Sequence, residues 1–321
     1  MGEFELIRNY FAAAPCAQAG EGVALGIGDD CALLTVTSGE QLAISTDTLV
    51  AGVHFPVVCD PFLLGQRALA VSASDLAAMG ATPLAFTLAL TLPSVDADWL
   101  QAFARGLNQM AQGCSLRLVG GDTTRGPLSL TLTVFGRVPT GQALTRSGAR
   151  PGDLLCVGGA LGDGAGALPL VLNQRSADAP VAEALLARYW SPQPQLALGQ
   201  ALRGKATSAL DISDGLLADC GHIALASNVR LLIEREALPL SSALSEFLGL
   251  EAAREAALTG GDDYVLAFTL PASQLTGLRA AGLSVHVVGR VEVGQGVVVL
   301  DADGQDVTPL TRGYQHFQES Q

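Results

Sequence analysis

The sequence predicts two domains of the α+β class, and three observations lead to that prediction. The chain has 321 residues, about twice the roughly 150 of a typical domain. A stretch of turn-forming residues at 145–153 interrupts the apolar segments near the middle of the chain. On both sides of it, strand-like segments neighbour one another and helical segments separate only some of them, which favours two α+β domains over one βαβ array. We therefore expect domains at 1–147 and 148–321.

The first domain, 1–147, combines helical and strand periodicity. Apolar residues recur every three or four positions over 61–79 and 97–112, which predicts helices, with Gly80 and Gly113 at their C-terminal ends. Strands are predicted over 41–45, 85–92, 116–119 and 128–138.

The second domain, 148–321, is expected to be richer in strands. Strands are predicted over 154–158, 208–212, 229–234, 265–270, 285–288 and 296–300. Helices are predicted over 181–189, 195–202 and 216–226, and another directly after the strand at 154–158. The segment 199–206, GQALRGKA, is close to the phosphate-binding pattern GxxxxGK[ST]. It ends in Ala206 where the pattern needs a hydroxyl, and a helix precedes it where the pattern needs a strand, so we interpret it as a helix end.

Composition excludes several classes of protein. Lys plus Arg total 18 and Asp plus Glu 31, giving a net charge of −13, which argues against nucleic acid or an anionic membrane as the main partner. No basic segment followed by an apolar one begins the chain, and no stretch of about 20 apolar residues predicts a membrane span. The six cysteines form no CxxC pair, which is typical of reduced thiols. We expect a cytoplasmic protein.

Carboxylates follow apolar strands at five places, often beside hydroxyls. They are Asp29–Asp30, Asp47 after Ser45 and Thr46, Asp122, Asp211 with Asp214, and Asp262–Asp263. A turn or a helix N-cap would explain any one of them. Five such sites, in a chain with only 15% charged residues, instead favour oxygen ligands for Mg²⁺. Metal ions would also allow this acidic protein to bind phosphates.

Two further features have alternative interpretations. Asp75 has the apolar helical neighbours Val71, Ala78 and Met79, so it either caps a break in the helix or binds metal; we favour metal. The glycine-rich run 158–166 lacks the GxGxxG spacing and either wraps a phosphate or forms a turn.

Motifs along nearly the whole chain resemble those of the thiamine-monophosphate kinases. The motifs are GIGDDCAL at 26–33, AISTDTLVAGVHF at 43–55, SDLAAMGA at 74–81, VGGDTTRGPLS at 119–129, LTRSGARPGD at 144–153, LDISDGLLADCGHI at 210–223, TGGDDY at 259–264 and RGYQHF at 312–317. This family belongs to the ATP-binding superfamily of aminoimidazole ribonucleotide synthase and selenophosphate synthetase. So many motifs in the same order make the resemblance specific.

The resemblance implies a kinase that transfers the γ-phosphoryl group of ATP in line onto thiamine monophosphate, with Mg²⁺ ions assisting. The product would be thiamine diphosphate, at the last step of its biosynthesis. The implied fold is PurM-like: an N-terminal mixed sheet with helices that pairs with a second subunit in a homodimer, and a larger C-terminal α/β domain.

The resemblance also implies roles for individual residues. The Mg²⁺ ligands would be Asp30, Ser45, Thr46, Asp47, Asp75, Asp122 and Asp211, with Asp214 binding a further cation. The contacts to ATP would be Gly121, Asp122, Arg146 and Ser213. The contacts to thiamine monophosphate would be His54, Asp262 and Phe317.

Some of these roles compete with simpler ones. By sequence alone, His54 between Val53 and Phe55 would more often be a core residue, and Phe317 could dock the chain end rather than stack on a thiamine ring. The family usually has Glu at position 262, so the substrate contact could come from Asp262 or Asp263. We assign no catalytic residue, because the attacking phosphate is already ionised and needs no strong general base.

Two other functions fit parts of the sequence. Another member of the superfamily could act on a ribotide or on selenide, although Cys16 and Cys31 do not lie in the flexible glycine-rich loop that selenide chemistry would need. A protein of another class, a non-catalytic sensor of Mg²⁺ and nucleotide, could use the same carboxylates.

Overall fold

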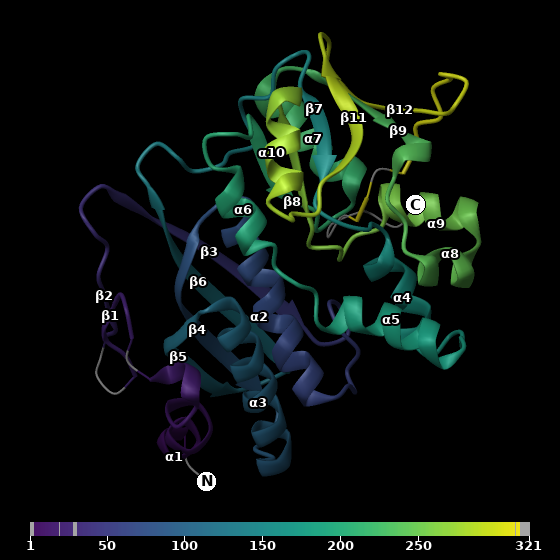
Figure 1. The fold of residues 1–321 in the computed structure, drawn as a ribbon. Coiled ribbons are helices and arrows are strands. Elements are labelled where there is room, and N and C mark those ends of the chain that lie inside the picture. Colours follow the sequence, from purple (N-terminus) through teal and green to yellow (C-terminus); the bar gives the residue numbers. More distant parts are fainter. Residues whose placement is uncertain (1–2, 19, 28–30, 312, 315–321) are drawn as a thin grey trace. The chain divides into compact units, whose positions relative to one another are not determined.

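Helices α2 and α3 cover one face of a four-stranded sheet in the N-terminal part of the protein (Figure 1). The computed structural model describes residues 3–18, 20–27, 31–311 and 313–314. The chain forms two units, one of residues 1–76 and 81–143 and one of residues 77–80 and 144–321. The elements that begin in the first unit are α1 (Glu3–Leu6), a π-helical turn (Ile7–Ala12), a 3-10 turn (Pro15–Ala17), β1 (Val23–Leu25), β2 (Leu33–Leu34), β3 (Glu40–Val50), α2 (Pro61–Ala78), β4 (Thr82–Leu92), α3 (Ala97–Cys114), β5 (Arg117–Arg125) and β6 (Ser129–Pro139).

The sheet of the first unit has the strand order β3-β6-β4-β5. Strand β6 is antiparallel to β3 and β4, and β5 is parallel to β4, so β3, β4 and β5 all run in one direction. Burial alternates along β6: Leu130, Leu132 and Val134 are fully buried, whereas Thr131 and Thr133 between them are not. The sheet therefore has one face packed under helices and one more open face.

Two glycines bring α2 and α3 into close contact. A Cβ atom on Gly106 would lie 1.9 Å from the carbonyl oxygen of Phe62, and one on Gly65 would lie 2.4 Å from that of Phe103. Helix α3 begins at Asp96, whose Oδ1 accepts hydrogen bonds from the amides of Asp98 and Trp99, each at 3.0 Å. The close approach packs α3 directly against α2, the helix that carries Asp75.

The second unit is built around a six-stranded sheet of order β12-β9-β11-β7-β10-β8. Its elements are β7 (Leu154–Val157), α4 (Asp163–Val171), α5 (Ala179–Trp190), α6 (Leu196–Leu202), β8 (Ser208–Asp211), α7 (Leu216–Ser227), β9 (Arg230–Glu234), a 3-10 turn (Arg235–Ala237), α8 (Ser242–Leu248), α9 (Leu250–Thr259), β10 (Leu266–Leu270), α10 (Ala272–Ala280), β11 (His286–Glu292) and β12 (Gly296–Leu300). Neighbouring strands are antiparallel except β9 and β12.

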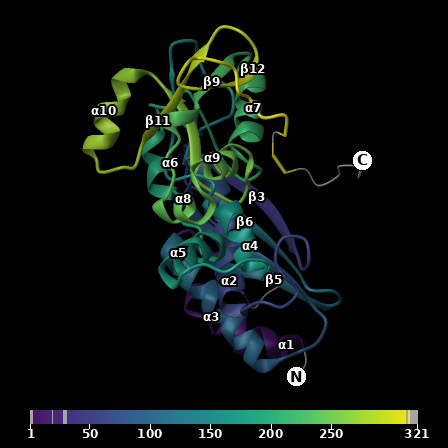
Figure 2. The ribbon, with the colours of Figure 1, turned by 90° about the vertical axis from the view of Figure 1, so that its right-hand side faces the viewer.

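Both faces of this second sheet are buried. On one side, Leu217 and Ile223 of α7 pack with β9 and β12; on the other, Leu278 of α10 packs with Phe268 of β10. Figure 2 shows α7 and α10 on opposite sides of the sheet. All five residues of β10 are buried, as expected for a central strand with helices on each side.

The predicted fold class is confirmed, as is every predicted strand and helix, with shifted ends. Strand β3 extends to Val50, beyond the predicted end at residue 45. The helix expected after the strand at 154–158 is α4, whereas the sequence analysis did not predict β1, β2, α8, α9 and α10 as separate elements. The helix at 196–202 precedes Gly204 and Lys205, so the rejection of a phosphate-binding GxxxxGK[ST] loop is also confirmed.

All six cysteines lie among the described residues and all are free thiols. Cys31 is exposed, Cys59 is half-buried, and Cys16, Cys114, Cys156 and Cys220 are buried. Within the described ranges, none of the helices combines the length and the apolar character needed to cross a bilayer.

Candidate functional site

In the first unit, Ser45, Asp47 and Asp75 come together where β3 passes under α2. The Ser45 hydroxyl donates a hydrogen bond to Oδ2 of Asp75. Burial and the negative charge of Asp75 raise the pKa of Asp47 to about 6, although a hydrogen bond with Ser72 lowers it. Ser72 and Asp75 are three residues apart on α2 and thus share one face of that helix. Helix α2 runs without a break over 61–78, so Asp75 does not cap a break in the helix, and its role as a metal ligand stays a prediction.

Thr46 and Asp122 lie on the other face of the same sheet. The Thr46 hydroxyl is 2.9 Å from that of Thr133, and Thr48 makes the same contact with Thr131 at 2.8 Å. Asp122 of β5 lies opposite Ala89 of β4, Ala89 lies opposite Thr131 of β6, and Thr131 lies opposite Thr48 of β3. Because directly opposed residues point to the same face of a sheet, Asp122 lies on the face of Thr48 and Thr46. Thr46 can therefore reach the Asp47–Asp75 pair only through its main chain.

The first unit thus divides the predicted metal ligands between two faces. Asp30, another predicted ligand, lies outside the described residues. Within the described part of the chain, no group of three or more His, Cys, Asp and Glu side chains is placed to hold a metal ion. The two carboxylates of Asp47 and Asp75, with the Ser45 hydroxyl, are the oxygen-only set that suits a hard cation.

Gly121 allows β5 to approach β4 very closely. A Cβ atom at this position would lie 1.9 Å from the carbonyl oxygen of Leu88, its partner in register. The neighbouring Gly120 has more room, since its nearest atom would be Cγ2 of Thr87 at 3.7 Å. Only the second glycine of the VGGD motif is thus required for strand pairing.

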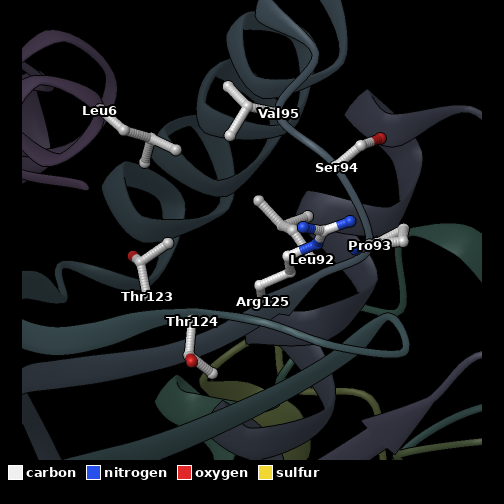
Figure 3. Close-up of a pocket in the computed structure, with 8 residues that line it drawn as sticks. All are labelled: Leu6, Leu92, Pro93, Ser94, Val95, Thr123, Thr124 and Arg125. Carbon is white, nitrogen blue, oxygen red and sulfur yellow. The ribbon is translucent and has the colours of Figure 1, made fainter. Parts of the chain in front are cut away.

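A pocket of about 510 Å³ opens just beyond Asp122, at the carboxyl ends of the parallel strands β4 and β5. Ligands commonly bind at such strand ends, and the volume is typical of small-molecule sites. Figure 3 shows Thr123, Thr124 and Arg125 along β5, below Leu6 and Val95. The complete lining is Leu6, Leu92, Pro93, Ser94, Val95, Thr123, Thr124 and Arg125. The sequence analysis did not identify this pocket, because Leu6 joins it from a segment distant in sequence.

His54 follows β3 and is held by the end of that strand. The amide of Val50 donates a hydrogen bond to its Nδ1 at 3.0 Å. An imidazole that accepts at Nδ1 is neutral and carries its proton on Nε2. His54 is half-buried, whereas Phe55 is 3% exposed and belongs to the core. The core role expected from the sequence alone therefore applies to Phe55.

In the second unit, three loops meet at one edge of the sheet. Strands β7 and β8 are both antiparallel to β10, so their carboxyl ends and the amino end of β10 lie at the same edge. Asp211 ends β8, and Ser213 and Asp214 follow in the loop before α7. The amide of Asp262 donates to the Ser213 carbonyl at 2.9 Å, and the amide of Tyr264 donates to that of Ile212 at 2.8 Å. The segments carrying Ser213, Asp214 and Asp262 are thereby joined.

Asp219, which the sequence analysis missed, organises this loop. Its Oδ2 accepts hydrogen bonds from the amides of Ser213, Asp214 and Gly215, each at 3.1 Å. Burial raises the pKa of Asp219 to about 7 despite these hydrogen bonds. Its position in the motif SDGLLAD was the available signal, but a carboxylate one turn into a helix is also an ordinary helix residue.

Asp262 and Asp263 have different environments. Asp263 is 6% exposed and accepts hydrogen bonds from the amide of Gly162, at 3.0 and 2.7 Å to its two oxygens, and from that of Gly164 at 3.4 Å. These amides of the glycine-rich run 158–166 are thus occupied by a protein carboxylate, which favours the turn interpretation of that run. Asp262 is only half-buried and is the one of the two with a side chain accessible to a ligand.

The backbone around Asp262 is strained. Asp262 has φ of 69° and Tyr264 has φ of 50°, both in the left-handed region that non-glycine residues rarely adopt. The Tyr264 hydroxyl donates to Oδ1 of Asp262 at 3.0 Å and orients that carboxylate. Strain of this kind is concentrated at functional sites.

Two predicted site residues of the second unit remain, Arg146 and Phe317. Arg146 is exposed, and its carbonyl oxygen accepts a hydrogen bond from the Ser227 hydroxyl at 3.1 Å. Phe317 lies outside the described residues. The preceding Tyr314 is 51% exposed, and its amide donates to the carbonyl oxygen of Asp214 at 3.0 Å. Tyr314 is therefore tied to the Asp214 loop.

The environment of Asp263 leads to a prediction about pH. Burial raises its pKa from the usual 3.8 to about 8, the Asp163 charge also raises it, and the amides of Gly162 and Gly164 lower it. The folded protein thus binds a proton at Asp263 more tightly than the unfolded chain does. The resulting stabilisation is complete below about pH 4 and is lost as the pH rises to about 8.

Asp263→Asn removes this proton-binding site. We expect the unfolding free energy of the variant to fall less steeply between pH 5 and 7, by up to about 1.4 kcal/mol per pH unit. Urea denaturation at several pH values measures the slope, and the exposed Asp98→Asn is the matched control. Equal slopes in Asp263→Asn and wild type would contradict the prediction.

Comparisons with known proteins agree with the motifs. Residues 28–138 match the family model described as AIR synthase related protein, N-terminal domain, and residues 150–301 match the corresponding C-terminal domain. Thiamine-monophosphate kinase of Escherichia coli (strain K12) is 47% identical over 321 residues, covering 98% of both chains. That of Bacillus subtilis (strain 168) is 34% identical over 329 residues, covering 99% of this chain and 100% of the relative.

Solved structures give the same result. The crystal structure of thiamine-monophosphate kinase from Stenotrophomonas maltophilia K279a superimposes with a TM-score of 0.83 at 47% identity, covering 89% of this chain and 92% of the other. A structure described as AaThiL complexed with AMPPCP and TMP has a TM-score of 0.79 at 32% identity, with coverages of 88% and 89%. The chain therefore belongs to the thiamine-monophosphate kinase family, with the two-domain α+β fold of the AIR synthase related proteins.

Proposed function

We propose that the protein transfers the γ-phosphoryl group of ATP to the phosphate of thiamine monophosphate, producing thiamine diphosphate and ADP. The observation that carries this proposal is the similarity to thiamine-monophosphate kinases over nearly the full length of the chain. The similar structure described as AaThiL is complexed with AMPPCP and TMP. A phosphate oxygen of thiamine monophosphate forms the new bond to the γ-phosphorus, and the bond from that phosphorus to the bridging oxygen of ADP breaks. The attacking oxygen is already ionised, so this chain supplies positioning and charge rather than a general base.

Mg²⁺ ions belong to this proposal. In the first unit they would be held by Ser45, Asp47 and Asp75 with Asp30, by the main chain of Thr46 and by Asp122; in the second, by Asp211, with Asp214 for a further cation. The raised pKa of Asp47 beside Asp75 supports this assignment, because two adjacent carboxylates are an arrangement that a divalent cation stabilises. When bound, such ions neutralise the negative charge of the reacting phosphates.

The protein's own groups would bind and orient the two substrates. Gly121 presents backbone beside Asp122 to the ATP phosphates, and Ser213 and Arg146 add a hydroxyl and a guanidinium. His54, held at the end of β3 by the Val50 amide, would contact thiamine monophosphate. Asp262 would accept from the amino-pyrimidine, and Phe317 would stack on the ring.

A direct product assay tests this function. Purified protein is mixed with ATP, Mg²⁺ and thiamine monophosphate, the thiamine phosphates are separated by chromatography, and EDTA is the control. We expect thiamine diphosphate and ADP in equal amounts, and neither with EDTA. ADP without thiamine diphosphate would mean that the phosphoryl group went to water, and would count against thiamine monophosphate as the acceptor; adding a ribotide or selenide would then test those acceptors. Bound ATP without ADP would indicate a nucleotide sensor.

We further propose a homodimer that pairs through the open face of the first sheet. Ile44 is 58% exposed and Leu42 is 39% exposed on that face, beside the paired threonines Thr46–Thr133 and Thr48–Thr131. An open sheet face with apolar side chains favours burial against another copy. A cytoplasmic location also remains a proposal, supported by six free thiols.

Ile44→Asp should dissociate such a dimer into monomers, since an aspartate would be buried without a partner in the interface. Sedimentation velocity measures the change in mass. Leu225→Asp is the matched control, because Leu225 is 83% exposed on α7 in the second unit. Wild-type protein that sediments as a monomer, or an Ile44→Asp variant that stays dimeric, would contradict the proposal.

A further inference from the structure

The loop Ser213–Gly215 directs three consecutive amide groups at one carboxylate oxygen. Oδ2 of Asp219 accepts from all three at 3.1 Å, and Asp219 is only 4% exposed. The conformation of the loop, including φ of 121° at Gly215, is therefore set by a side chain from the first turn of α7.

The carbonyl groups of the same loop face two other segments. The Ser213 oxygen accepts from the amide of Asp262 at 2.9 Å, and the Asp214 oxygen accepts from that of Tyr314 at 3.0 Å. Glycines allow both approaches: a Cβ on Gly261 would lie 2.4 Å from the Ser213 oxygen, and one on Gly313 would lie 2.5 Å from the Asp214 oxygen. The loop thus joins the residues assigned to nucleotide and cation to those assigned to thiamine monophosphate.

We propose that Asp219 is a positioning residue that holds the Ser213–Gly215 loop in its binding conformation. Through that loop it aligns Ser213 and Asp214, assigned to ATP and a cation, with Asp262, assigned to thiamine monophosphate. This inference rests on the proposed function for the roles of Ser213, Asp214 and Asp262. Asp219 touches neither substrate in this assignment; it acts through the backbone of residues that do.

Asp219→Asn tests the proposal with a change of nearly equal volume. Asparagine keeps one acceptor oxygen but loses the charge, so the loop is held less firmly. We expect KM to rise about tenfold for both ATP and thiamine monophosphate, the size expected for weakening hydrogen bonds to a charged group, with a smaller change in kcat. Binding of the ATP analogue AMPPCP, measured by calorimetry, should weaken by a similar factor.

Asp153→Asn is the matched control for a purely structural effect. Asp153 is also buried, at 5% exposure, and its Oδ2 accepts from the amide of Arg150 at 2.9 Å and from the hydroxyl of Thr207 at 2.7 Å. We expect it to lower thermal stability without changing either KM. If Asp219→Asn behaves in the same way, with lower stability but unchanged KM values and AMPPCP affinity, the proposal is overturned.

Gly313→Ala keeps the proposal testable if Asp219→Asn does not fold. This change crowds the Asp214 carbonyl oxygen and Cβ of Ala218, so it acts on the contact between chain end and loop and leaves the Asp219 side chain unaltered. We expect a higher KM for thiamine monophosphate and an unchanged KM for ATP. Unchanged KM values for both would contradict the link between loop and chain end. If the wild type forms no thiamine diphosphate, the proposed function fails, but the AMPPCP comparison still decides the role of Asp219.

Discussion

Asp47→Asn should abolish phosphoryl transfer, lowering kcat/KM by about a thousandfold or more, while the protein stays folded. Asparagine has nearly the same shape but removes one of the two facing carboxylates that would hold Mg²⁺. The stability should change in the opposite direction. Burial and Asp75 raise the pKa of Asp47 to about 6, so the ionised form is disfavoured in the folded protein at neutral pH. A neutral side chain removes that penalty, and we expect Tm to rise by about 2–4 °C.

The thiamine diphosphate assay and differential scanning calorimetry measure these two effects. Asp98→Asn is the control, because it makes the same chemical change at an exposed position in the first turn of α3. It should leave both activity and Tm nearly unchanged. An Asp47→Asn variant that keeps a tenth or more of the wild-type activity would count against the metal assignment at this pair.

Gly121→Ala is the second change with a large expected effect. The Cβ of the alanine would lie 1.9 Å from the Leu88 carbonyl oxygen, so β5 must move away from β4 where Gly121 and Leu88 are paired. We expect a loss of about 3 kcal/mol or more in unfolding free energy, as for other changes that force the backbone apart. Weaker AMPPCP binding should accompany it, because the same backbone is assigned to the phosphates.

Gly120→Ala provides the comparison one residue away. Its Cβ would meet only Cγ2 of Thr87, at the ordinary contact distance of 3.7 Å. This variant should lose less than about 1 kcal/mol and keep its affinity for AMPPCP. Urea denaturation of both variants measures the difference, and equal stabilities would show that β4 and β5 do not need the close approach at Gly121.

Much of the fold could be predicted from the sequence because its strands are apolar, although those of the second unit have only four to seven residues. Helices α8, α9 and α10 were missed, whereas α6, with seven residues, was predicted; α8 and α9 are separated by Gly249 alone. Short helices of this kind are stabilised by their packing, and the sequence carries a weak signal for them.

The sequence could nominate candidate site residues, but not their arrangement. Thr46 and Asp47 are adjacent in one strand, so alternation alone required their side chains to point to opposite faces. The place of Asp122 depends on the register across β6 and β4, which only the paired strands reveal. The role of Asp219 depends on a loop turning back onto its own helix. Such contacts are tertiary, and no spacing in the sequence predicts them.

The uneven burial of the six thiols gives the protein a natural attachment point for a spectroscopic probe. Burial raises the pKa of Cys59 to about 11 and the pKa values of Cys114 and Cys156 to about 12, which keeps these thiols in the unreactive protonated form near neutral pH. Cys31 is exposed and directly follows the GIGDD segment. A fluorophore on Cys31 would therefore sit beside a predicted metal ligand, in a chain whose other cysteines need not first be removed.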